Sequence, residues 1–116
     1  KLLKKKDSLT NEEKFALEDA EFALSWALYS KGRYEEALPH AKLAYDLSRV
    51  LKVRKLQGES TYALPCCLAL LSDPPNAVKF LKEAIALDAS YRKQAKTEKD
   101  FDKVRVDAEF KKLVGF

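Results

Sequence analysis

The sequence predicts an all-α fold, and three observations support this prediction. The 116 residues include only three glycines and four prolines, which leaves little room for long loops. Alanines and leucines recur at helical spacing along much of the chain. A pattern of small and apolar residues also repeats after 40 positions, so that Ala37 is matched by Ala77 and Ala44 by Ala84. Internal repeats of roughly 20–50 residues are typical of stacked structural units.

The first helix is predicted to begin near Asn11 and to end near Ser30. Thr10 is followed three residues later by Glu13, which is the capping-box pattern of a helix start. Small and apolar residues at helical spacing predict the face that this helix turns toward the core. They are Ala20, Leu24, Ala27 and Leu28.

A second helix is predicted from Tyr34 into the low fifties, after a turn at Gly32. Glycine adopts the left-handed conformation of such a turn without steric cost. Pro39 lies near the start of this helix and removes one backbone donor. The apolar stripe then continues through Leu43, Leu47, Val50, Leu51 and Leu56. We therefore expect the helix to run on for one or two turns, toward a break at Gly58.

Two further helices are predicted in the second half of the repeat. One covers roughly residues 60–71 and should bend at Pro65, because an interior proline disturbs the helical hydrogen bonds. Asp73 and Pro74 are a cap and a first helical residue. They predict a helix over Pro74–Leu87.

The last part of the chain is predicted to cover the end of the repeat. A short helix over residues 91–96 is expected behind a cap at Ser90, and a final helix over residues 108–114 behind Asp107. Four apolar residues are expected to cover the exposed face of the fourth helix, as a terminal unit of a stack requires. They are Phe101, Val104, Phe110 and Leu113.

The stretch from Leu24 to Leu47 closely resembles a tetratricopeptide repeat (TPR) unit. It carries a pattern of small and large residues, then Gly32, the aromatic Tyr34, Glu36-Ala37 and later alanines. The 40-residue spacing exceeds the usual value of about 34 and predicts an insertion. The long second helix and its Glu-Ala-x-Pro run resemble the kinesin-light-chain type of repeat. Residues 99–110 resemble a segment that closes many bacterial and organellar TPR proteins.

The resemblance implies a right-handed α-solenoid fragment with four segments. Residues 1–9 form a basic arm or the end of a preceding helix, and residues 10–57 form a first unit with an extended second helix. Residues 58–89 form a second unit, and residues 90–116 form the capping segment. The resemblance also implies that the protein is a scaffold or adaptor that binds a helix or peptide of another protein.

TPR units form a concave groove lined mostly by the first helix of each unit, and this implies a set of partner-binding residues. The set is Asp19, Phe22, Trp26, Tyr29, Glu59, Tyr62 and Cys66. Tyrosine and tryptophan are frequent anchors at interfaces. The alternative is that these rings belong to the core. An aromatic, slightly acidic groove lacks the basic residues with which some TPR domains hold acidic chaperone tails, so that function is not expected.

Two other functions remain open. The first is self-association, in which Phe15 and Leu17 at the open N-terminal edge are buried against a second copy. A basic edge would instead bind an anionic partner, although such cations are also common as solvated surface residues. The basic edge comprises Arg49, Lys52, Arg54, Lys55, Arg92, Lys93 and Lys96.

The remaining composition argues against catalysis and nucleic-acid binding. The net charge of +4 is mild, and no aromatic residues alternate with the basic ones. His40 and Cys66 lack a nearby acid in the sequence pattern, and two cysteines with one histidine are too few for a zinc site. We therefore expect no enzyme activity, no metal and no cofactor.

The sequence also bears on the compartment. The adjacent Cys66 and Cys67 are poorly placed for a structural disulfide, which favours a reducing compartment such as a bacterial cytoplasm or an organelle stroma. No apolar run is long enough to span a bilayer. The chain begins at Lys1 and contains no methionine, so we expect an excised fragment, which leaves open an anchor upstream.

Overall fold

A computed structural model describes residues 9–115 of the chain as an all-α structure. The predicted basic arm therefore lies outside the described residues, except for Leu9. No strand occurs in the described range, which contains six α-helices and one 3-10 helix. In chain order these are α1 (Asn11–Ser30), α2 (Tyr34–Leu51), α3 (Arg54–Leu70), α4 (Pro74–Leu87), α5 (Ser90–Thr97), η2 (Lys99–Val104) and α6 (Ala108–Val114).

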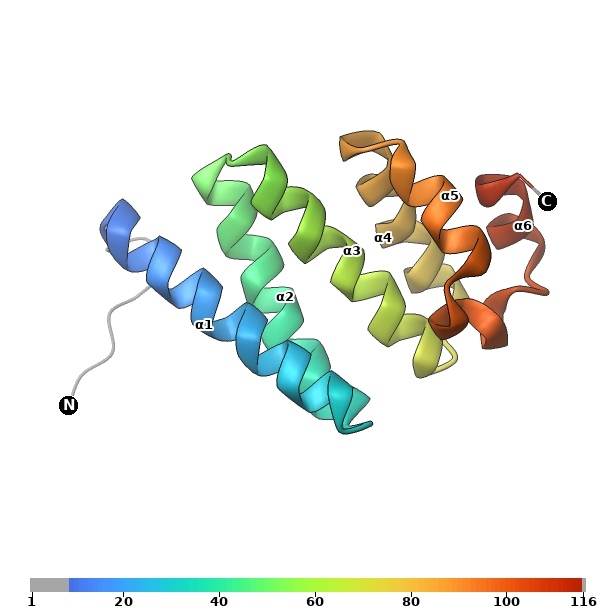
Figure 1. Cartoon of the computed structure of the whole chain (residues 1–116), viewed down its shortest axis with the longest axis horizontal. Coiled ribbons are helices and arrows are strands. Elements are labelled where there is room, and N and C mark those ends of the chain that lie inside the picture. Colours follow the sequence, from blue (N-terminus) through green and yellow to red (C-terminus); the bar gives the residue numbers. More distant parts are fainter. Residues whose placement is uncertain (1–8, 116) are drawn as a thin grey trace.

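The helices follow one another along an elongated body of 48 × 27 × 19 Å, with α1 and α6 at opposite ends (Figure 1). Each long helix packs against the next one in the chain, so α2 lies against both α1 and α3. Below, the first unit means α1 with α2, and the second unit means α3 with α4. The short elements η2, α5 and α6 cover the second unit, η2 against α3 and the other two against α4.

The turns of the two units have the same backbone geometry. Gly32 ends the α1 side of the first turn with φ +77°, and Ser72 occupies the equivalent place 40 residues later with φ +60°. In the first turn the N–H of Arg33 donates to the carbonyl of Leu28 at 2.9 Å. The pair 40 positions later makes the same bond at 2.9 Å. The repeat in the sequence is thus a repeat in the backbone, even where serine replaces glycine.

The helix starts that the sequence predicted from local capping are confirmed. Thr10 and Glu13 form both bonds of a capping box, at 2.9 and 3.1 Å. Asp73 and Asp107 each accept a hydrogen bond from a backbone N–H three residues later, at 3.4 and 3.1 Å. α1, α4 and α6 begin where these caps place them.

The predicted break at Gly58 is wrong. α2 extends one turn beyond the length of α4 but ends at Leu51, where Lys52 adopts the left-handed conformation with φ 59°. α3 then begins at Arg54, and Gly58 lies buried inside it. A Cβ atom at Gly58 would lie 3.3 Å from the hydroxyl of Tyr91, so this glycine allows α5 to approach α3 closely.

The predicted core face of α1 is also wrong. Ala20 and Ala27 are exposed, and Leu24 keeps 43% of its surface exposed. The residue equivalent to Leu24 in the second unit is Leu64, which is fully buried in α3. The difference follows from position in the stack, because α2 covers this face of α3 and no described helix covers it on α1.

The capping segment is held by buried rings and by one arginine. Phe101 and Phe110 are fully buried, and their centroids lie 5.3 Å apart. Arg105 donates to the carbonyls of Lys96 at 2.5 Å and of Glu98 at 2.6 Å, which lie at the C-terminal end of α5. The carbonyls at the end of a helix lack partners within it, so this guanidinium both satisfies them and fixes α5 against η2.

Candidate functional site

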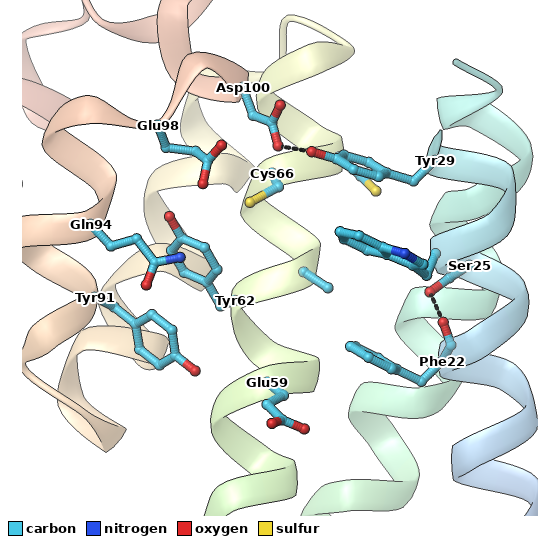
Figure 2. Close-up of a pocket in the computed structure, with 13 residues that line it drawn as sticks. Phe22, Ser25, Tyr29, Glu59, Tyr62, Cys66, Tyr91, Gln94, Glu98 and Asp100 are labelled. Carbon is cyan, nitrogen blue, oxygen red and sulfur yellow. Dashed lines mark hydrogen bonds between the residues drawn. The ribbon is translucent and has the colours of Figure 1, made fainter. Parts of the chain in front are cut away.

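A cavity of about 370 Å³ opens between α1, α3 and the segment from α5 to η2 (Figure 2). Its volume lies at the lower end of the range of roughly 300–1,000 Å³ that is typical of ligand sites. The lining side chains are Phe22, Ser25, Trp26, Tyr29, Glu59, Tyr62, Ala63, Cys66, Cys67, Tyr91, Gln94, Glu98 and Asp100.

Aromatic rings form two walls of the cavity. Figure 2 shows Phe22 and Tyr29 on the α1 side, facing Tyr62 and Tyr91 on the other side. Trp26 stacks on Tyr29 with centroids 5.2 Å apart, and Tyr62 stacks on Tyr91 at 4.5 Å. Phe22, Trp26 and Tyr29 fall at spacings of four and three residues, which place them along one side of a helix.

Two polar contacts join α1 to α3 and η2. The hydroxyl of Tyr29 donates to Asp100 of η2 and so bridges one end of the cavity. The hydroxyl of Ser60 in α3 donates to the carboxylate of Glu18 in α1 at 2.8 Å. Burial raises the pKa of Glu18, because the charged carboxylate loses hydration there.

The polar part of the lining is acidic. Glu59, Glu98 and Asp100 contribute carboxylates, whereas no described residue that lines the cavity is lysine, arginine or histidine. The pKa of Glu98 is raised, first by burial and then by the neighbouring charge of Asp100. A neighbouring negative charge and the loss of hydration both destabilise the charged form of a carboxylate such as Glu98.

Tyr62 is 92% buried, since only 8% of its surface is exposed. Its hydroxyl is one of two buried side-chain polar atoms in the described part of the chain that have no hydrogen-bond partner. Burial raises the pKa of Tyr62 above its usual range, so this hydroxyl stays protonated. A buried hydroxyl without a partner costs free energy and calls for an explanation.

The cysteines and His40 have environments that do not favour nucleophilic chemistry. Both cysteines are free thiols and buried. Burial raises the pKa of Cys66 well above its usual value and that of Cys67 to about 11. The reactive species is the thiolate, which such a pKa disfavours near neutral pH. His40 does not line the cavity, and its Nδ1 lies 2.6 Å from a carboxylate oxygen of Glu21.

Six of the seven residues predicted to bind a partner line this cavity, while Asp19 is exposed outside it. The prediction missed that the capping segment also lines the cavity, because the sequence indicates only a covering role for it. A signal was available, because Tyr91, Gln94 and Glu98 are three and four residues apart and share one side of a helix. Their binding role, like that of the six, stays a prediction.

The predicted basic edge is divided by acidic residues. Arg49 lies 3.4 Å from Glu83, and Arg92 donates to the carbonyl of Leu113 at 3.1 Å. Arg54 lies near Asp88 and contributes to lowering the pKa of that carboxyl, although the main cause is the hydrogen bond from Ser90. The predicted cap at Ser90 is wrong. The Asp88 carboxylate instead accepts a hydrogen bond from the N–H of Ser90, the first residue of α5.

Comparison of the chain with models of known protein families, with curated protein sequences and with solved structures finds no match. Within residues 9–115, no helix is both long and apolar enough to cross a membrane. The same range contains no group of three or more His, Cys, Asp or Glu side chains placed to hold a metal ion.

Proposed function

We propose that this protein is a TPR-type interaction module that binds another protein through the cavity between α1, α3 and α5. The observation that carries the proposal is an open, mostly aromatic cavity at the place where the first helices of successive units meet. Trp26 illustrates its character, because 61% of this large ring remains exposed. Exposed tryptophan beside tyrosine is typical of residues that anchor a partner.

The TPR assignment is supported by the repeated turn geometry and by matched burial in the second helices. Ala37 and Ala77 are both fully buried, as are Ala44 and Ala84. Small residues at these positions let adjacent helices approach closely. The assignment as a binding module without catalysis is supported by the environments of Cys66, Cys67 and His40.

The size of the cavity limits what part of a partner enters it. A helix with its side chains is about 10 Å across, and 370 Å³ equals less than one turn of such a cylinder. The cavity therefore receives side chains that project from a partner helix or extended peptide, while the partner backbone remains at the rim. Aromatic burial supplies the affinity, and the three carboxylates select against acidic partners.

Selection of peptides from a random displayed library tests this proposal. We expect enriched peptides that change the fluorescence of Trp26, the only tryptophan, and that lose at least about tenfold in affinity on Trp26→Ala. Val106→Ala is the matched control, because Val106 is 79% exposed and does not line the cavity. Peptides that bind the Trp26→Ala variant as well as the wild type would contradict the proposal.

The exposed outer face of α1 supports self-association as a second candidate function. This face consists of Ala16, Ala20, Ala23, Leu24 and Ala27, all exposed. The equivalent residues of α3 are largely covered by α2. Sedimentation at several concentrations should show dimers of the wild type and monomers of Leu24→Glu. Monomers of the wild type at every concentration would exclude this candidate. Phe15, which the sequence assigned to such a contact, is 41% exposed.

A further inference from the structure

We propose that the cavity holds the ammonium or guanidinium group of a lysine or arginine side chain presented by the partner protein. This inference rests on the proposed function and narrows it to one ligand chemistry. Three independent features of the cavity support it: its rings, its charges and the unpaired hydroxyl of Tyr62.

The rings provide an environment that attracts organic cations. Trp26, Tyr29, Tyr62 and Tyr91 come from three different elements and line one space (Figure 2). The faces of aromatic rings carry partial negative charge, and cations within about 6 Å of a ring centroid are attracted to them. The methylene stem of a lysine or arginine side chain also packs favourably on such rings.

The charges of the lining complement a cation. Up to three negative charges come from Glu59, Glu98 and Asp100. No described residue of the lining carries a positive charge. This local imbalance occurs in a chain whose net charge is +4. Burial and the neighbouring charge of Asp100 raise the pKa of Glu98, and a bound cation would offset both effects. An anionic group would be repelled, and a purely apolar group would leave the negative charges of the lining uncompensated.

The hydroxyl of Tyr62 offers the cation a hydrogen-bond acceptor in addition to the carboxylates. This hydroxyl is buried and unpartnered, and it belongs to a residue that lines the cavity. Figure 2 shows it pointing toward Glu98 and Gln94. An ammonium or guanidinium group has only donors. It can donate to a lone pair of this hydroxyl and to the carboxylate of Glu98 at the same time. A bound cation thus provides a partner for the orphaned oxygen and compensates the acidic lining.

Single-residue probes test the inference without knowledge of the partner. The probes are the N-acetyl methylamides of lysine and arginine, each compared with its uncharged analogue, norleucine or citrulline. Titrations are followed by Trp26 fluorescence. We expect at least one basic probe to bind about fivefold or more tightly than its analogue, and the difference to shrink as salt is added.

Charge variants provide the control. Glu59→Gln combined with Glu98→Gln should weaken the basic probe about fivefold. Glu35→Gln combined with Glu109→Gln removes the same charge from exposed positions outside the cavity and should change binding less than about twofold. Tyr62→Phe should also weaken the basic probe while leaving the norleucine probe unaffected.

The inference is overturned if the charged and uncharged probes bind equally, if neither binds, or if the two double variants behave alike. The fate of the proposed function is decided separately by the displayed peptides. If selected peptides still depend on Trp26 but tolerate replacement of their lysines and arginines by norleucine and citrulline, the binding function stands and the cation site does not. If no peptide depends on Trp26, the binding function itself fails.

Discussion

α1 and α3 have equivalent places in the repeat but different surroundings. α3 lies between α2 and α4 and is also contacted by η2, and ten of its seventeen residues are buried. Only Glu18 and Ser25 are buried in the twenty residues of α1. The same helical pattern is therefore core in one unit and surface in the other. Burial in a stack depends on the neighbours that a helix has, and the helix with fewer neighbours is the one that keeps rings available for a partner.

The largest expected effect comes from truncating the equivalent leucines. Leu64→Ala should lower the free energy of unfolding by about 2–5 kcal/mol, because it leaves a cavity in a closely packed region. Leu24→Ala should cost less than about 1 kcal/mol, because that side chain is already 43% exposed. Denaturant unfolding measures both. Equal losses would mean that a neighbour covers α1 in solution.

Arg105→Met tests the cover that only the second unit has. Arg105 holds the end of α5, which packs on the second unit and not on the first. The variant should lose about 1.5–3 kcal/mol of stability, since it removes charged donors from the carbonyls that end α5. Arg92→Met is the control, because Arg92 lies in α5 itself and makes a single bond, to the carbonyl of Leu113 at 3.1 Å, on the exposed surface. A loss as large for Arg92 as for Arg105 would contradict this view of α5.

Two tyrosines with 8% exposure test whether the hydroxyl of Tyr62 lacks a partner. The Tyr45 hydroxyl donates to Glu83 at 2.5 Å, so Tyr45→Phe should cost about 1–2 kcal/mol. Tyr62→Phe should cost nothing or stabilise the fold slightly, because no bond is lost. Denaturant unfolding at neutral pH compares them. A larger loss for Tyr62→Phe would show that its hydroxyl is paired within the protein.

Tyr45 also makes the stability of the fold depend on pH. Burial, with the neighbouring Glu83, raises the pKa of Tyr45 to about 12. Between the ordinary tyrosine pKa of about 10 and this value, the folded state keeps a proton that the unfolded state releases. Stability should therefore fall as the pH rises from about 10 to about 12. The fall should be smaller in Tyr45→Phe, and an unchanged slope would contradict the assignment.

The smallest expected effect concerns the contact between α1 and α3. Because the pKa of Glu18 is raised by burial, the folded state holds its proton more tightly than the unfolded state does. This contribution to stability is present at low pH and is lost as the pH rises through the raised pKa. Glu18→Gln should therefore be more stable than the wild type at pH 7 by less than about 1 kcal/mol.

The advantage of Glu18→Gln should disappear on acidification, since glutamine still accepts the hydrogen bond from Ser60. Unfolding curves at several pH values measure it. Asp19→Asn removes the same charge from an exposed neighbour and should not reproduce the pattern. If both variants changed alike, net charge rather than burial would be the cause.

Local chemistry made much of the fold predictable. Thr10, Asp73 and Asp107 mark helix starts because capping involves residues only three positions apart. The sequence placed the end of α2 in the low fifties, and α2 does end at Leu51. The residue at which it ends has no such local signal, because Lys52 adopts a left-handed conformation that its side chain does not favour. Gly58 was misinterpreted because a glycine required for close packing has the same appearance in a sequence as one that ends a helix.

Only the walls of the cavity that come from α1 and α3 were predictable. The register of α1 and α3 placed Phe22, Trp26 and Tyr62 together because helical spacing and the repeat fix their relative positions. The exposure of Leu24 depends on what lies beyond α1, which no local pattern specifies. The carboxylates of Glu98 and Asp100 reach the cavity through the fold of the capping segment, whose position depends on the hydrogen bonds of Arg105 and on the buried ring of Phe101.

Nuclear magnetic resonance mapping of the basic probe that binds more tightly, on nitrogen-15-labelled protein, tests the central claim most directly. We expect the largest shifts at the Trp26 indole N–H, at the Gln94 side-chain amide and at backbone amides around Tyr62, since these groups border the cavity. Shifts confined to the outer face of α1 or to the turn at Lys52 would contradict the account, because they would place the ligand outside the cavity.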